Sequence, residues 1–102
     1  MSKNAKYKVL VLTSDPETID QVRSIAKTYF KNVSLLFWEF GNKATKADVV
    51  KQIEQTDYDL LISYINGIIL KQQHLDKADY GAVNIHPAPP EHGGAGWILT
   101  AP

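Results

Sequence analysis

The chain has 102 residues, and its 11 lysines and arginines balance 11 aspartates and glutamates. A net charge of zero argues against a nucleic-acid surface, because neutralising phosphates requires a basic excess. The absence of cysteine excludes disulfides, thiolate nucleophiles and cysteine-based metal sites. The polar N-terminus has no apolar signal region behind it, and no apolar segment reaches membrane-spanning length. We therefore expect one cytoplasmic domain over residues 1–102 that binds neither nucleic acid nor membrane.

Short apolar runs alternate with amphipathic segments along the chain. Residues 7–12 are typical of a strand buried in a parallel sheet. Ser14 and Glu17 have the spacing of a capping box, which predicts a helix start at 13–17. The later predicted elements are a strand at 33–40, a helix capped by Thr45 and Asp48, a strand at 60–65, a short helix at 71–77 and a strand at 82–86. This order predicts an α/β domain with a mostly parallel, four-stranded Rossmann-like sheet and flanking helices.

Two polar side chains stand at the end of the last predicted strand. Asn84 and His86 are two residues apart, so along a strand they project from the same face. A loop rich in proline and glycine follows them, and ligands of open α/β sheets bind at such strand ends. An amide donor beside a titratable base can move a proton while holding a developing oxyanion. We therefore predict Asn84 and His86 as catalytic residues.

The same motif carries a family resemblance. Asn84-Ile85-His86-Pro87 is followed by a loop containing Pro89-Pro90-Glu91, and it is preceded by Asp59–Tyr64 and Ile68–Leu70. From Asp59 to Gly96 the chain resembles the folate-dependent formyltransferases, whose mark is a strand ending in Asn-x-His-Pro before a Pro-containing loop. That family formylates glycinamide ribonucleotide, methionyl-tRNA and nucleotide-linked amino sugars, and the Pro-Pro-Glu spelling is closest to the amino-sugar branch.

The resemblance implies a reaction and a set of roles. A formyl group would pass from 10-formyltetrahydrofolate to a small-molecule amine, such as an amino-sugar nucleotide. Asn84 and His86 would stabilise the tetrahedral oxyanion formed by attack of the amine. The implied cofactor-binding positions are Tyr64, Asn66, Gly67 and Pro87. No metal is expected, because the spacing of His86, Glu91 and His92 matches no familiar helical zinc motif.

Two departures from the family pattern limit these implications. His92-Gly93-Gly94 stands where the family has Tyr-Arg-Gly or Tyr-Pro-Gly. The family's third catalytic residue, an aspartate well beyond the histidine loop, has no counterpart before Pro102. We therefore expect a truncated formyltransferase-like domain that is inactive or incomplete as an enzyme. A fourth strand beside the first would then leave an open edge along 82–86, and this edge and the apolar tail at 97–99 favour a homodimer.

Other interpretations of the same residues stay open. The chain could be a fragment of an active formyltransferase or a non-catalytic remnant that binds a ligand or a partner. It could also be a receiver-like signalling domain phosphorylated at Asp15, although no acidic pair is evident to hold magnesium. Tyr64 is equally typical of a core aromatic, and Asn66-Gly67 is first of all a turn pair. His74, on a short polar helix, is expected to be exposed.

Overall fold

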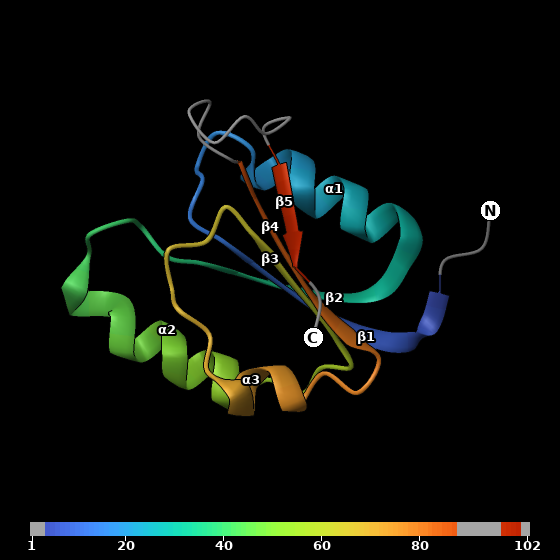
Figure 1. The fold of residues 1–102 in the computed structure, drawn as a ribbon. Coiled ribbons are helices and arrows are strands. Elements are labelled where there is room, and N and C mark those ends of the chain that lie inside the picture. The colour runs from blue at the N-terminus through green and yellow to red at the C-terminus, as the bar shows by residue number, and fades with distance from the viewer. Residues whose placement is uncertain (1–3, 88–96, 101–102) are drawn as a thin grey trace.

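Strands and helices alternate along the chain in a computed structural model that describes residues 4–87 and 97–100. The elements are β1 (Asn4–Thr13), α1 (Ile19–Tyr29), β2 (Phe30–Phe37), α2 (Lys43–Gln55), β3 (Leu60–Tyr64), α3 (Gln72–Asp76), β4 (Gly81–Pro87) and β5 (Trp97–Thr100). Helix α1 covers one face of the sheet, and α2 and α3 cover the other (Figure 1). The predicted α/β class, with four parallel strands and flanking helices, is confirmed. None of the described helices combines the length and apolarity that crossing a membrane would require.

The strand order is β2-β1-β3-β4-β5, with the first four strands parallel and β5 antiparallel to β4. The prediction that the fourth strand lies beside the first is wrong, because β1 is already paired on both edges, by β2 and by β3. From β2 the chain crosses back over β1 to form β3, so the direction of winding reverses at β1. In open α/β sheets, ligands bind outside the carboxyl ends of the strands at such a reversal.

The predicted open edge of the fourth strand is also wrong over much of its length. Strand β5 pairs with β4 from Asn84 opposite Thr100 to Pro87 opposite Trp97. An unpaired strand edge presents a row of N–H and C=O groups that need partners. Here an apolar segment of the same chain supplies them. The homodimer stays a prediction, but its premise of an open strand edge does not hold along residues 84–86.

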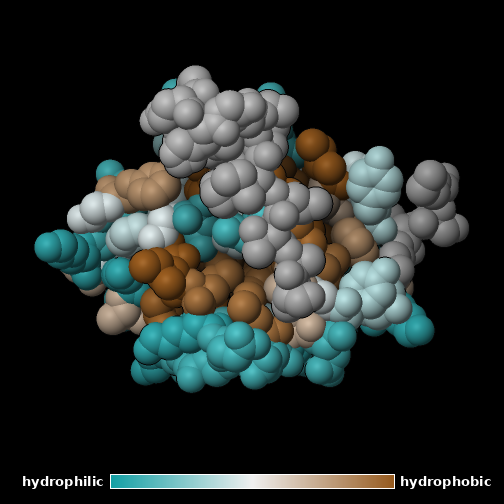
Figure 2. Space-filling model, in the orientation of Figure 1, coloured by the Kyte–Doolittle hydropathy of each residue, from teal (hydrophilic) through white to brown (hydrophobic). Residues whose placement is uncertain are grey.

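The core forms two layers, one on each face of the sheet. Side chains alternate along β1, so Leu10 and Leu12 pack towards α2 while Val9 and Val11 pack towards α1. All four are almost fully buried, which explains why β1 is a continuous apolar run. In the space-filling view, hydrophobic residues gather in the middle of the face shown, above the hydrophilic surface of α2 and α3 (Figure 2).

Helix α1 begins at Ile19, so the capping box predicted from Ser14 is wrong. Ser14 is instead buried and joins two loops. Its N–H donates to the carbonyl of Ile65 at 2.8 Å, and its Oγ accepts from the N–H of Gly67 at 3.0 Å. Asp15 closes the turn that follows, since its carboxylate accepts from the N–H of residue 17 and from a threonine hydroxyl. The polar groups of Ser14 and Asp15 therefore form hydrogen bonds within and between loops instead of capping the helix.

Two further boundaries differ from the predicted ones. Strand β2 runs over 30–37 rather than 33–40, because α1 ends directly in Phe30, which is already extended with φ −126° and ψ 141°. Helix α2 begins at Lys43, ahead of the predicted caps Thr45 and Asp48. The Thr45 hydroxyl donates back to the carbonyl of Asn42, so this threonine lies within the first turn instead of capping it.

The expectation that His74 is exposed is wrong, because only 1% of its surface is accessible. Its Nδ1 accepts from the backbone N–H of Lys71 at 3.0 Å, so Nε2 carries the proton and faces the Glu54 carboxylate at 3.3 Å. The Tyr58 hydroxyl donates to the His74 carbonyl at 2.8 Å. Although the sequence of the short helix α3 is polar, its buried His74 attaches it to α2.

Candidate functional site

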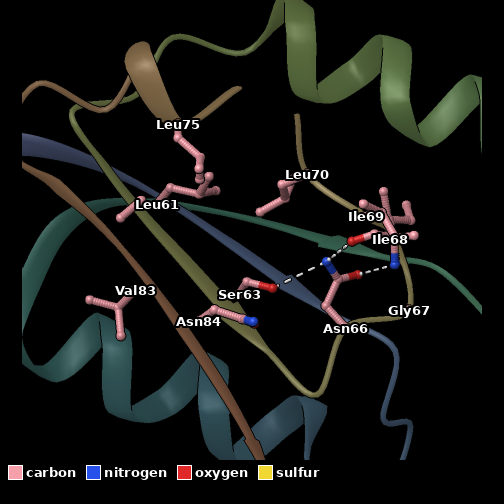
Figure 3. A pocket seen from close by; sticks show the side chains of 11 residues that line it. Leu61, Ser63, Asn66, Gly67, Ile68, Ile69, Leu70, Leu75, Val83 and Asn84 are labelled. Atoms are coloured by element: carbon pink, nitrogen blue, oxygen red, sulfur yellow. Dashed lines mark hydrogen bonds between the residues drawn. The ribbon is translucent and has the colours of Figure 1, made fainter. Parts of the chain in front are cut away.

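A cavity of about 400 Å³ lies along β3 and β4, on the face that α2 and α3 cover. The segment 66–70 forms its opposite wall, as Figure 3 shows. Most of its lining is apolar, and three polar side chains face it. These are Ser63, Asn66 and Asn84. An apolar cavity with a few convergent polar groups, in the size range of about 300–1,000 Å³, is typical of a small-molecule site.

Ser63 and Asn84 form the polar centre of the cavity. They are register partners on β3 and β4, and Figure 3 shows their side chains next to one another. Ser63 Oγ accepts a hydrogen bond from the Asn66 amide at 3.1 Å, which leaves its own proton to donate. Within the described part of the chain, the Asn84 amide has no hydrogen-bond partner. A ligand in the cavity therefore meets one hydroxyl donor and one complete amide.

Asn66 lines the cavity, but the hydrogen bonds of its amide are made within the chain. Its Nδ2 donates to Ser63 Oγ and, at 3.0 Å, to the carbonyl of Ile68. Its Oδ1 accepts from the N–H of Ile68 at 3.1 Å. Both donor hydrogens are used, so this residue fixes the turn and orients Ser63. Asn66 lines the cavity, and its predicted role in binding the cofactor stays a prediction.

The turn before this wall is strained. Ile65 has a φ of 43°, in the left-handed region that β-branched residues rarely adopt. Hydrogen bonds on both sides hold it there, from the N–H of Ser14 to its carbonyl and from its own N–H to the carbonyl of Ile85. Strain of this kind, of order 1–3 kcal/mol, tends to be retained at ligand and catalytic sites. It supports the assignment of a site to this end of the sheet.

Gly67 allows two aromatic rings to approach the wall closely. A Cβ atom at this position would lie 2.5 Å from Cε1 of Phe40 and 2.7 Å from Cζ3 of Trp38. Real Cβ atoms do not approach carbon so closely, so any side chain larger than hydrogen displaces a ring. The two rings meet edge to face, with centroids 6.3 Å apart. Gly67 is therefore required by packing, whatever it contributes to a ligand.

Replacement of Gly67 with alanine is expected to lower the free energy of unfolding by about 1–3 kcal/mol, the range for overpacking a well-packed site. Urea unfolding followed by circular dichroism measures the loss. Phe40 is 59% exposed and can be removed at small cost. The Gly67→Ala change in a Phe40→Ala background should therefore cost clearly less than in the parent. Equal costs in the two backgrounds would show that the close contact with Phe40 is not what requires glycine.

Among the other predicted site residues, the structure describes the side chain of Tyr64 alone. Tyr64 follows Ser63 on β3, so it points to the opposite face of the sheet and does not line the cavity. His86 and Pro87 lie in β4, but their side chains fall outside the described ones, as does the segment 88–96. The predicted juxtaposition of Asn84 with His86, the His92-Gly93-Gly94 element and the metal interpretation of His86, Glu91 and His92 therefore stay untested.

One residue of the site was missed in the sequence. Ser63 is the polar position in an otherwise apolar strand, and that break was the available signal. The alternative role of Asp15 as a phosphate acceptor gains no support, since both of its carboxylate oxygens accept hydrogen bonds within its own loop. Within residues 4–87 and 97–100, no cluster of three or more histidine or acidic side chains is placed to hold a metal ion.

Comparisons with known proteins find no matching family model, no matching curated protein and no matching solved structure. What the chain does is therefore inferred from its own residues.

Proposed function

We propose that the chain is a folate-dependent formyltransferase-like domain of the cytoplasm whose cavity takes 10-formyltetrahydrofolate. The observation that carries this proposal is the Asn84 amide, which faces the cavity without a protein partner in the described part of the chain. Asn84 opens the Asn-x-His-Pro motif that ends β4. An N–H that has no partner among the described residues and lies in a largely apolar cavity is available to a developing oxyanion, and it acts there more strongly than in water.

The chemistry follows from the family reaction. 10-Formyltetrahydrofolate would supply the formyl group, and the amine would replace the tetrahydrofolate nitrogen on the formyl carbon. Asn84 would donate an N–H to the oxyanion that develops on the formyl oxygen, and a protonated His86 would stabilise it as a cation. The tetrahydrofolate nitrogen would gain a proton and the amine would lose one, which requires a proton acceptor. No residue is assigned to this last step, so we expect binding without turnover.

The cavity offers apolar surface on two sides of a bound ring. Leu61 and Ala82 come from the sheet, and Ile68 and Leu70 come from the opposite wall, so apolar surface lies on two sides. A ring between these walls would have the apolar surface of both its faces removed from water, which favours binding by about 25 cal/mol per Å². The Ser63 hydroxyl and the Asn84 amide could then fix its orientation through hydrogen bonds.

The test is a titration with 5-formyltetrahydrofolate, a stable relative of the cofactor, followed by calorimetry. We expect saturable binding that Asn84→Ala weakens about tenfold, the loss of one hydrogen bond of about 1.4 kcal/mol. Asn32→Ala is the matched control, because Asn32 is exposed on β2, away from the cavity. Absence of saturable binding, or equal weakening by both changes, would exclude the cavity as a folate site.

A separate assay with 10-formyltetrahydrofolate and an amino-sugar nucleotide separates the enzyme from the non-catalytic remnant. We expect no formyl transfer above background. Steady turnover that disappears in His86→Ala would instead show a complete enzyme.

A further inference from the structure

A second hollow, of about 820 Å³, lies between helix α2 and the segment 68–74. We call it the lysine groove, because four lysines line it. They are Lys43, Lys46 and Lys51 on the helix and Lys71 on the opposite side. Glu54 is the one carboxylate among the described residues that line it. Four positive charges therefore face one negative charge, in a chain whose net charge is zero.

No protein group compensates the three lysines on α2 in the described part of the chain. Among the described residues, none of the three ammonium groups on α2 has an ion pair or a hydrogen bond, and the Lys46 ammonium lies 5.9 Å from the centre of the Trp38 ring. Glu54 is already engaged by His74 and by the amide of Gln73, which donates to it at 2.9 Å. The excess of positive charge in the lysine groove is therefore left for an external anion.

The position of two of these lysines is unfavourable for the helix itself. Lys43 begins α2 and Lys46 follows three residues later, whereas the first turn has no acidic residue and the last turn has no basic one. Helices are stabilised by the opposite order, with acids first and bases last. This order of charges does not stabilise the helix. It would, however, stabilise a negatively charged ligand bound in the lysine groove.

The groove also has an apolar surface. Ala47 and Val50 contribute it from α2, and Ile68 and Ile69 contribute it from the facing segment. Ile69 is 83% exposed, so its side chain is available to cover part of a ligand. The occupant should therefore combine negative charge with an apolar or aromatic part.

The spacing of the lysines indicates a chain of charges instead of a single anion. Lys43 and Lys51 lie eight residues apart on α2, which corresponds to about 12 Å along the helix axis. Lysine is a compact point charge that binds phosphate groups well. We propose that the lysine groove binds an organic polyphosphate such as a nucleoside triphosphate, with its phosphates along the lysines and its ring on Ile69. The groove is separate from the folate cavity, although Ile68 and Ile69 line both, and it does not depend on the proposed function.

The experiment is a calorimetric titration with ATP of the parent chain and of a Lys43→Gln, Lys46→Gln double variant. Binding should weaken at least tenfold in the variant. Its melting temperature should not fall, because these two lysines oppose the helix dipole. The matched control is Lys27→Gln, Lys31→Gln, which removes the same charge from the end of α1 and the start of β2. Its affinity should stay within twofold of the parent.

Two more probes test the chemical class. Ile69→Ser should weaken ATP but leave tripolyphosphate, which has no ring, unchanged. Triglutamate tests whether carboxylates are the natural charges. The proposal is overturned by absence of saturable ATP binding, by equal losses in the two lysine double variants, by an equal effect of Ile69→Ser on ATP and tripolyphosphate, or by triglutamate binding more tightly than tripolyphosphate.

Discussion

Replacement of His74 with alanine is expected to lower the free energy of unfolding by about 3 kcal/mol. His74 is almost fully buried, and its Nδ1 is the acceptor for the backbone N–H of Lys71. Alanine leaves this N–H without a partner, which costs about 1–3 kcal/mol, and it opens a cavity between α3 and α2. Urea unfolding of the parent and the variant, fitted with a common slope, measures the difference.

Two matched variants separate the causes of this loss. Gln73→Ala removes the neighbouring exposed residue, which also bonds Glu54, and should cost less than about 0.5 kcal/mol, as surface changes usually do. His74→Phe fills the volume but accepts no hydrogen bond, so it should lose at least the part that belongs to the Lys71 N–H. A loss of less than about 1 kcal/mol in His74→Ala would show that His74 does not fasten α3.

The Tyr58 hydroxyl also helps to attach α3 to the rest of the chain. Burial, and to a smaller extent the nearby Glu54 carboxylate, raises the pKa of this hydroxyl above its ordinary value of 10.0. The neutral form is therefore favoured in the folded chain, and it donates to the His74 carbonyl. The stability that this contributes is fully present below pH 10 and is lost as the pH rises through the higher folded pKa.

Much of the fold could be predicted because buried parallel strands are continuous apolar runs. Strands β1, β3 and β4 were predicted within a few residues of their observed bounds on this basis. The order of the strands could not be predicted, since a run of apolar residues carries no information about its neighbour. The start of α1 was missed because Ser14 bonds a distant loop instead of the helix. The burial of His74 was missed because its partner Glu54 is twenty residues away.

The candidate site was predictable in part. Asn84, Asn66 and Gly67 all lie at the cavity. These positions could be predicted because strand ends and turn pairs are marked locally in the sequence. Tyr64 follows Ser63 on β3 and therefore projects from the face opposite the cavity, so its predicted cofactor-binding role stays a prediction. The pairing of Ser63 with Asn84 depends on the register of two strands, and no local pattern indicates that register.

Deletion of residues 97–102 is expected to increase self-association of the chain. This removes β5 and leaves the outer edge of β4 unpaired from Asn84 to Pro87. Unpaired N–H and C=O groups along an apolar strand recruit another strand, which in a dilute solution comes from a second copy. A homodimer through the apolar tail stays a prediction, but the pairing of β5 with β4 shows that the tail covers the edge in the folded chain.

Sedimentation velocity at rising concentration, from about 10 to 300 μM, tests whether the deletion increases self-association. The shortened chain should form dimers or larger species at concentrations where the parent shows less association, and it should unfold at lower urea, since the backbone pairs of β5 are lost. Deletion of residues 101–102 alone is the control, because it shortens the chain but keeps β5. Less association of the shortened chain than of the parent would show that residues 97–102 carry the contact between copies, and the covering role of β5 would then be wrong.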